Sequence, residues 1–111
     1  MRALPFAVVA ADGIRLRGES WPGGSDWVLM VHDVGSDLDC WRPLIGPLAA
    51  AGYSVATIDL RGHGASDGEV SEVNLEDDLS ALLAVARRDA SGILVLVAAG
   101  TAAAAAKSMS S

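Results

Sequence analysis

Three apolar runs, each ending in a loop that leads to a helix-forming segment, constrain the fold of this chain more than any other feature. The runs cover Trp27–His32, Tyr53–Asp59 and Ile93–Val97. Their apolar residues are largely consecutive and do not alternate with polar ones, which is typical of strands covered on both faces of a parallel sheet. Strands that alternate with helices form right-handed crossovers, so the pattern predicts an α/β fold with a mostly parallel sheet.

The segments between and after these runs predict flanking helices. Trp41–Ala51 is predicted as a helix in which Pro47 causes a kink or a late start. Asn74 is predicted to cap a second helix, because acidic residues fill its first turn and an arginine pair its last. A third helix is predicted from Thr101 to about Ser108.

The amino-terminal segment predicts an antiparallel hairpin at the edge of the sheet. Its strands are Phe6–Ala10 and Ile14–Ser20, and Asp12-Gly13 between them is a hairpin turn signal. The segment also has features of a short secretion signal, namely one basic residue and a small-residue end. The alternation of apolar and basic residues in the second strand favours the hairpin.

Composition and charge exclude several classes of function. The chain has 111 residues, a net charge of −6 and scattered basic residues, so it offers no basic stripe to nucleic acid. The uncharged run 92–106 is shorter than a membrane span of about 20 residues. Cys40 is the only cysteine, which excludes an intrachain disulfide and a multi-cysteine metal site. We expect a cytoplasmic protein with no nucleic-acid or membrane partner.

Two junctions between a strand and a loop resemble those of a known family. Residues 55–68 read VATIDLRGHGASDG, a β-rich run that ends in a glycine-rich loop, and WVLMVHDVGS ends a second run at His32. Together they resemble the first half of an α/β-hydrolase domain, the fold of serine esterases, lipases and peptidases. The resemblance spans nearly the whole chain and implies one domain, residues 1–111, that is incomplete on its carboxyl-terminal side.

The catalytic serine of that family is missing from the third junction. The family carries G-x-S-x-G at a sharp turn between a strand and a helix, whereas residues 98–102 here read AAGTA. Gly100 takes the nucleophile position, where we expect a positive φ, and no catalytic residue is assigned. Thr101 comes one residue late. His32 and His63 both precede the junction, although the family order is nucleophile, acid, histidine.

The resemblance also implies where an oxyanion hole would lie, the pair of N–H groups that stabilises charge on a carbonyl oxygen. Its backbone donors would be Val34 and Thr101 around an empty space, with His32 and Asp33 lining the pocket. The family has a glycine in place of Asp33, whose carboxylate would oppose an oxyanion. The residues also fit a simpler interpretation, a loop in which His32 hydrogen-bonds neighbouring backbone.

Two other kinds of site fit the sequence poorly. The three aspartates of residues 33–39 lack the spacing of a calcium loop, so we expect a solvated acidic turn and no metal. Gly62-x-Gly64 resembles part of a dinucleotide fingerprint, but Asp67 replaces its third glycine and no helix begins at once. No cofactor is expected.

These observations predict a catalytically silent protein of the α/β-hydrolase type that acts by binding or assembly. Two alternatives remain open, a hydrolase completed by another chain or using an unusual nucleophile, and a small dinucleotide-binding module. The strand Ile93–Val97 is central in the resembled fold, so its outer edge is expected to be unpaired and to recruit a second copy or a complementing chain. The sequence indicates no particular small-molecule ligand.

Overall fold

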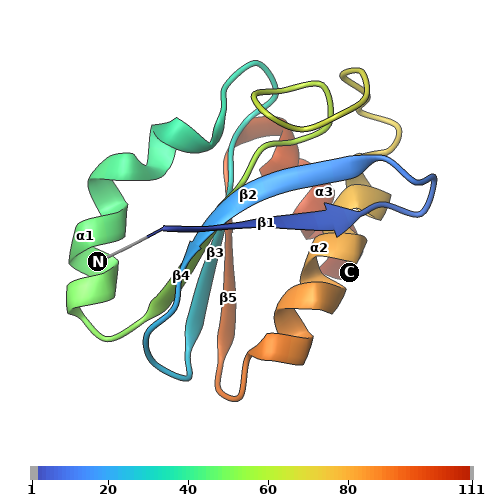
Figure 1. Cartoon of the computed structure of the whole chain (residues 1–111). Coiled ribbons are helices and arrows are strands. Elements are labelled where there is room, and N and C mark those ends of the chain that lie inside the picture. Colours follow the sequence, from blue (N-terminus) through green and yellow to red (C-terminus); the bar gives the residue numbers. More distant parts are fainter. Residues whose placement is uncertain (1–2, 111) are drawn as a thin grey trace.

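The three apolar runs form the neighbouring strands at one side of a single five-stranded sheet (Figure 1). The structure is a computed structural model and describes residues 3–110. In chain order the elements are β1 (Leu4–Val9), β2 (Arg15–Trp21), β3 (Trp27–Val31), the 3-10 helix η1 (Leu38–Trp41), α1 (Arg42–Ala50), β4 (Ser54–Ile58), α2 (Leu75–Asp89), β5 (Leu94–Ala98) and α3 (Gly100–Ser110).

The strand order β1-β2-β4-β3-β5 confirms the predicted α/β class with a mixed sheet. β3 pairs in parallel with β4 on one side and with β5 on the other, and Val28 lies opposite both Val55 and Val95. The hairpin β1–β2 adds the antiparallel edge. Its turn is closed by the hydrogen bond from the Ala10 N–H to the Ile14 carbonyl, and Gly13 has a φ of +89°. The expected hairpin is therefore present, with strands shifted by one or two residues.

The sheet separates two apolar clusters, because alternate residues of each strand point to opposite faces. Figure 1 shows α2 and α3 on one face and α1 on the other. The larger cluster, between the sheet and α2 and α3, contains Val8, Leu16, Leu29, Val31, Ala56, Ile58, Leu60, Leu75, Leu79, Leu82 and Ala102. The smaller cluster, under α1, contains Trp21, Val28, Met30, Ile45 and Val55. The face under α1 is covered by one helix alone.

The helix boundaries follow the sequence with two differences. The helix predicted over Trp41–Ala51 begins at Arg42 after a 3-10 turn, and Pro47 lies inside it, so the expected late start is present. The prediction that Asn74 caps α2 with its side chain is wrong. Its amide instead donates to Ser71 Oγ at 2.8 Å, and the acidic first turn of α2 is left to stabilise the helix dipole. None of the helices within residues 3–110 is long and apolar enough to cross a membrane.

Candidate functional site

The junction between β5 and α3 is a sharp turn from strand to helix. β5 ends at Ala98, the N–H of Ala99 donates to the carbonyl of Val31 at 3.1 Å, and α3 begins at Gly100. Gly100 has a φ of +55°, a conformation that glycine adopts without the steric penalty of a Cβ atom. The backbone geometry expected at this position is present, and the residue at the apex carries no reactive atom.

The carboxylate of Asp33 fills the space beside this apex. The N–H of Thr101 donates to Asp33 Oδ1 at 2.8 Å. A Cβ atom placed on Gly100 would overlap with the same carboxylate. The empty hole expected beside Thr101 is therefore absent, because the side chain of Asp33 reaches back across the turn and occupies it.

Both N–H groups expected to act as oxyanion donors act on this carboxylate. The hydrogen bond from the Thr101 N–H holds the pKa of Asp33 below its ordinary value, against the opposing effect of partial burial. The Thr101 hydroxyl and the Val34 N–H lower the pKa of this carboxyl further. Asp33 is consequently ionised at neutral pH, and its charge lies at the amino-terminal end of α3, where the helix dipole favours an anion.

His32 joins the loop after β3 to the loop after β4. Its Nδ1 donates to the carbonyl of Asp33 at 2.6 Å, and its Nε2 accepts from the N–H of Leu60 at 2.9 Å. Because Nε2 accepts a hydrogen bond, the ring is neutral with its proton on Nδ1. Burial is the main cause that lowers the pKa of His32. The ring was expected to line a pocket, and in the structure it has no exposed surface. Its contacts are those of the simpler interpretation, bonds to neighbouring backbone.

His63 makes a second link between the same two loops. Its Nε2 accepts from the N–H of Gly35 at 2.8 Å, and its Nδ1 donates to the carbonyl of Arg61 at 2.9 Å. The rings of His63 and His32 lie 5.0 Å apart. Both nitrogens of each ring are engaged with backbone groups, so neither histidine has a free nitrogen with which to accept a proton from a substrate or nucleophile.

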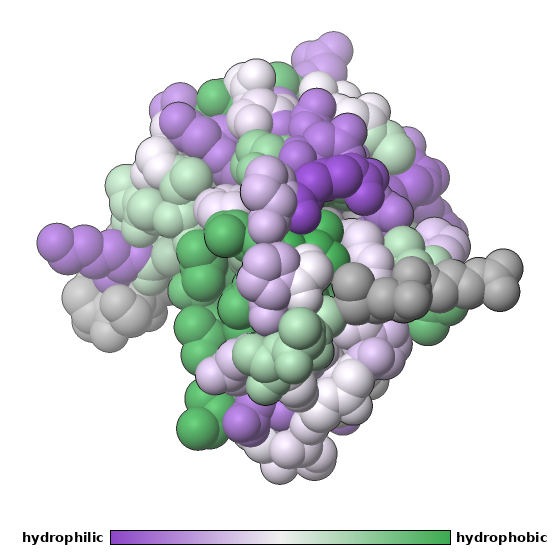
Figure 2. All heavy atoms as spheres, turned by 90° about the vertical axis from the view of Figure 1, so that its left-hand side faces the viewer, coloured by the Kyte–Doolittle hydropathy of each residue, from purple (hydrophilic) through white to green (hydrophobic). Residues whose placement is uncertain are grey.

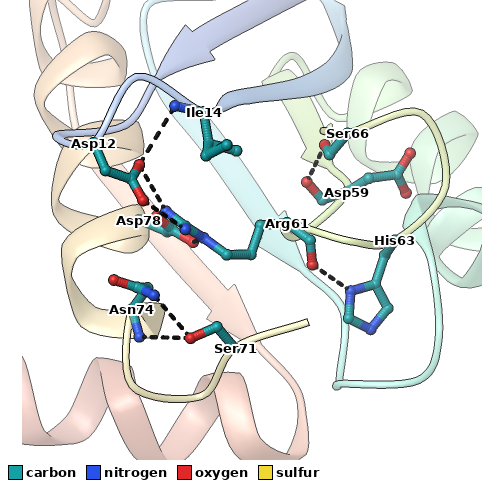
Figure 3. A network of polar contacts seen from close by, with 9 residues as sticks. All are labelled: Asp12, Ile14, Asp59, Arg61, His63, Ser66, Ser71, Asn74 and Asp78. Carbon is teal, nitrogen blue, oxygen red and sulfur yellow. Dashed lines mark hydrogen bonds and ion pairs between the residues drawn. The ribbon is translucent and has the colours of Figure 1, made fainter. Parts of the chain in front are cut away.

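Arg61 anchors the glycine-rich loop to two other parts of the chain (Figure 3). Its Nε and one terminal nitrogen each donate to the carboxylate of Asp78 on α2 at 2.7 Å. Its terminal nitrogens also contact Asp12 in the β1–β2 turn, at 2.7 and 3.1 Å. The side chains of Arg61 and Asp78 are 8% and 1% exposed. The bidentate contact with Asp78 and the ion pair with Asp12 raise the pKa of Arg61 above its ordinary value.

Sequence reasoning missed this ion-pair network. A usable signal lay in α2, where Asp78 falls on the same helical face as Leu75, Leu79 and Leu82. A carboxylate on a buried apolar face needs a charged or donating partner, because an unpaired buried charge is strongly unfavourable.

Asp59 organises the loop from inside. Its carboxylate accepts from the N–H of Leu38 at 2.8 Å and from the N–H of Ala65 at 3.0 Å. Gly64 has a φ of +48°, and a Cβ atom there would overlap with this carboxylate. The glycine-rich loop is therefore built around Asp59. Since α2 begins only at Leu75, the loop does not place a helix end near its glycines as a dinucleotide site requires.

The acidic turn after β3 does not form a metal centre. Asp37 accepts from the N–H of Asp39 at 2.9 Å, and Asp39 pairs with Arg42 at 2.7 Å. The third aspartate of the turn is the one at the start of α3. Within residues 3–110 no group of histidine, cysteine, aspartate and glutamate side chains is placed to hold a metal ion.

A groove of about 790 Å³ lies apart from the turn at Gly100. It is lined by residues of the β1–β2 hairpin, η1, the first residue of α1 and the loop after β4. Arg17 in its wall pairs with Asp67, and Arg42 pairs with Glu19 as well as with its neighbour in η1. None of its lining residues belongs to the junction between β5 and α3.

The sheet order, the loop built around Asp59 and the turn at Gly100 define an α/β-hydrolase domain. The chain belongs to the family described as serine aminopeptidase, S33, whose model matches residues 25–104. An esterase of Pyrococcus furiosus is similar in structure with a TM-score of 0.85 and 24% identity, over 95% of this chain and 45% of that chain. An epoxide hydrolase of Vigna radiata is similar with a TM-score of 0.77 and 25% identity, over 94% of this chain and 34% of that chain.

One curated relative is similar in sequence. It is the dihydrolipoyllysine-residue acetyltransferase component of the acetoin cleaving system of Cupriavidus necator, 40% identical over 73 residues, which are 66% of this chain and 19% of that protein. The chain therefore spans less than half of the length of each of these proteins.

Proposed function

We propose that this chain is a catalytically silent member of its family that acts by binding or assembly. The observation that carries the proposal is the contact between the carboxylate of Asp33 and the N–H of Thr101. It places a fixed anion where a hydrolase needs free donors beside a nucleophile.

The chemistry of acyl transfer gives this contact its meaning. Such a reaction needs a nucleophile at the turn and N–H donors aimed at the oxygen on which negative charge develops. Gly100 supplies no nucleophilic atom, and the donors at Val34 and Thr101 already stabilise the charge of Asp33. A developing oxyanion would meet a carboxylate at hydrogen-bonding distance from the same N–H groups, so like-charge repulsion would raise the barrier instead of lowering it.

The base is absent for a related reason. His32 and His63 both use their two ring nitrogens to join backbone segments. Either ring would have to give up a hydrogen bond of the loop framework before it accepted a proton. The family's acid and histidine would have to come from outside the residues of this chain, which is how a complementing chain enters the proposal.

A second candidate function is favoured by one contact of Thr101. Its hydroxyl hydrogen-bonds the carboxylate of Asp33, and a hydroxyl beside a carboxylate is a conceivable nucleophile and base. The relatives described as an esterase and an epoxide hydrolase make hydrolysis the reaction to test. Against this candidate, the lowered pKa of Asp33 makes its carboxylate a weak base.

A fluorophosphonate probe and a generic activated ester test both candidates on the intact chain. We expect neither stoichiometric labelling nor turnover by the folded protein, with a serine esterase as the positive control for the reagents. Stoichiometric labelling would overturn the proposal. Its loss in Thr101→Val, with the fold retained by circular dichroism, would establish the second candidate. The variant Gly100→Ser should stay inert even when combined with Asp33→Gly, because the new hydroxyl still has no base.

A further inference from the structure

β5 is an edge strand with one side unpaired. It pairs only with β3 in the described sheet. The N–H of Trp27 donates to the carbonyl of Ile93 just before β5, and the N–H of Ala99 donates to the carbonyl of Val31 just after it. Residues 93 and 99 therefore direct their peptide groups toward β3.

The alternation of a strand fixes which peptide groups face outward. Successive residues direct their N–H and C=O groups to opposite sides, so the even-numbered residues of β5 face away from β3. These residues are Leu94, Leu96 and Ala98. Among the described residues no hydrogen-bond partner is found for their N–H and C=O groups, and such a row of free groups is a template for another strand.

Nothing along this edge discourages pairing. β5 reads LVLVA, without charge, proline or glycine, whereas β1 at the opposite edge contains Pro5, which has no N–H to offer. Val95 is 43% exposed and Ile93 is 67% exposed. Both lie toward the thinly covered face under α1, where Figure 2 shows an apolar strip.

We propose that this edge joins two copies of the chain, with β5 pairing antiparallel to β5 of the second copy about a two-fold axis at Leu96. Centring the pairing on Leu96 puts Leu94 opposite Ala98 of the second copy. Each outward residue then exchanges both its N–H and its C=O bond with its opposite residue, as hydrogen-bonded pairs of an antiparallel ladder do. Such an interface is isologous and closes at the dimer.

The side chains fit the same arrangement. The register puts Val95 opposite Val97 of the second copy in a pair without direct hydrogen bonds, where side chains approach most closely. A two-fold axis perpendicular to the sheet keeps the α1 face of both copies on one side, so these valines extend the cluster of Val28 and Met30 across the dimer. The exposed surface of Val95 is buried by the contact.

The opposite face of the edge also has room for a partner. A groove of about 440 Å³ runs between α2, β5 and α3 and is lined mainly by apolar residues, including Leu83, Leu96 and Ala106. Leu96 of the second copy lies at the mouth of this groove in the proposed pairing. Because the strand itself is uncharged, the net charge of −6 is not concentrated at the contact.

Light scattering of the intact protein over a range of concentrations tests the dimer. We expect the molar mass to rise to twice 11.3 kDa. The variant Val95→Lys places a charge opposite an apolar partner and should keep the protein monomeric where the parent chain is dimeric. Val9→Lys is the matched control, since Val9 is 55% exposed on the other edge strand, and it should leave the dimer intact.

Hydrogen exchange separates this interface from any other. In the dimer the amide of Leu96 should become protected as concentration rises, whereas the amide of Val97 should be protected at all concentrations by its bond to β3. A monomer at every concentration would refute the proposal. So would a dimer that survives Val95→Lys, or one in which the amide of Leu96 still exchanges rapidly.

Discussion

Replacing Gly100 by alanine is the substitution whose effect is most closely specified by the structure. The residue has a φ of +55°, and its missing Cβ leaves the space into which the Asp33 carboxylate reaches. Alanine adds a single carbon atom and no polarity. Any effect of the substitution therefore comes from backbone strain and from collision with that carboxylate.

The two contributions have different sizes. A residue other than glycine in a left-handed or otherwise sparsely populated conformation costs about 1–3 kcal/mol. The collision adds to this, because Asp33 must move and give up its hydrogen bond to the Thr101 N–H. We expect the free energy of unfolding to fall by more than the strain alone. Each kcal/mol corresponds to about 4–8 °C in Tm for a domain of this size.

Chemical denaturation of four variants separates the contributions. Gly13→Ala is the matched control, since Gly13 has a φ of +89° and a Cβ atom there would meet no atom within 4 Å. This variant reports strain alone. Gly100→Ala should be clearly more destabilising than Gly13→Ala in the parent chain. In an Asp33→Gly background, Gly100→Ala should lose its excess and cost about as much as the control, about 1–3 kcal/mol.

The reasoning fails if the effects of Gly100→Ala and Asp33→Gly are additive. Additivity would mean that the two residues do not share the space at the start of α3, because contacting residues give coupled effects. An effect of Gly100→Ala no larger than that of Gly13→Ala would likewise refute the collision, and with it the main support for a filled oxyanion site.

Three further substitutions test the framework around the site. His32 accepts a backbone hydrogen bond and its pKa lies below the ordinary 6.5, so the unfolded chain binds the proton more readily; the free energy of unfolding should fall as pH drops from 7 to 5, and His32→Gln should flatten that profile. Asp78→Ala leaves a buried guanidinium without its main partner and should cost about 3–5 kcal/mol in urea unfolding, much more than Asp12→Ala at the exposed end of the network. Ala102→Leu overpacks a fully buried position and should cost about 1–3 kcal/mol by thermal unfolding, whereas Ala104→Leu on the exposed side of α3 should be nearly neutral.

The sheet was predictable because its strands carry their signal locally. Continuous apolar runs bounded by glycine and polar residues gave β3, β4 and β5 to within about one residue at each end. The positive φ of Gly100 was predictable for a related reason, since a strand that turns at once into a helix needs a conformation favourable to glycine.

The polar contacts were not predictable in the same way, because they join residues far apart in the sequence. The bond from Thr101 to Asp33 spans 68 positions, and that from Arg61 to Asp12 spans 49. Each partner taken alone fits an exposed loop residue. Asn74 failed as a cap because a competing partner, the hydroxyl of Ser71, lay within reach, and local propensity does not decide between two acceptable hydrogen bonds.

The contact at the start of α3 makes the two departures from the family pattern one structural change. A serine in place of Gly100 would collide with the carboxylate of Asp33, so the nucleophile and this aspartate exclude each other unless the loop moves. A glycine in place of Asp33 would leave the N–H of Thr101 without its acceptor and the helix dipole without its anion. With Asp33 and Gly100 together, both requirements are met. The carboxylate stabilises the same N–H groups that a reaction intermediate would otherwise use, and stability at this turn is thereby gained at the position from which catalysis has been lost.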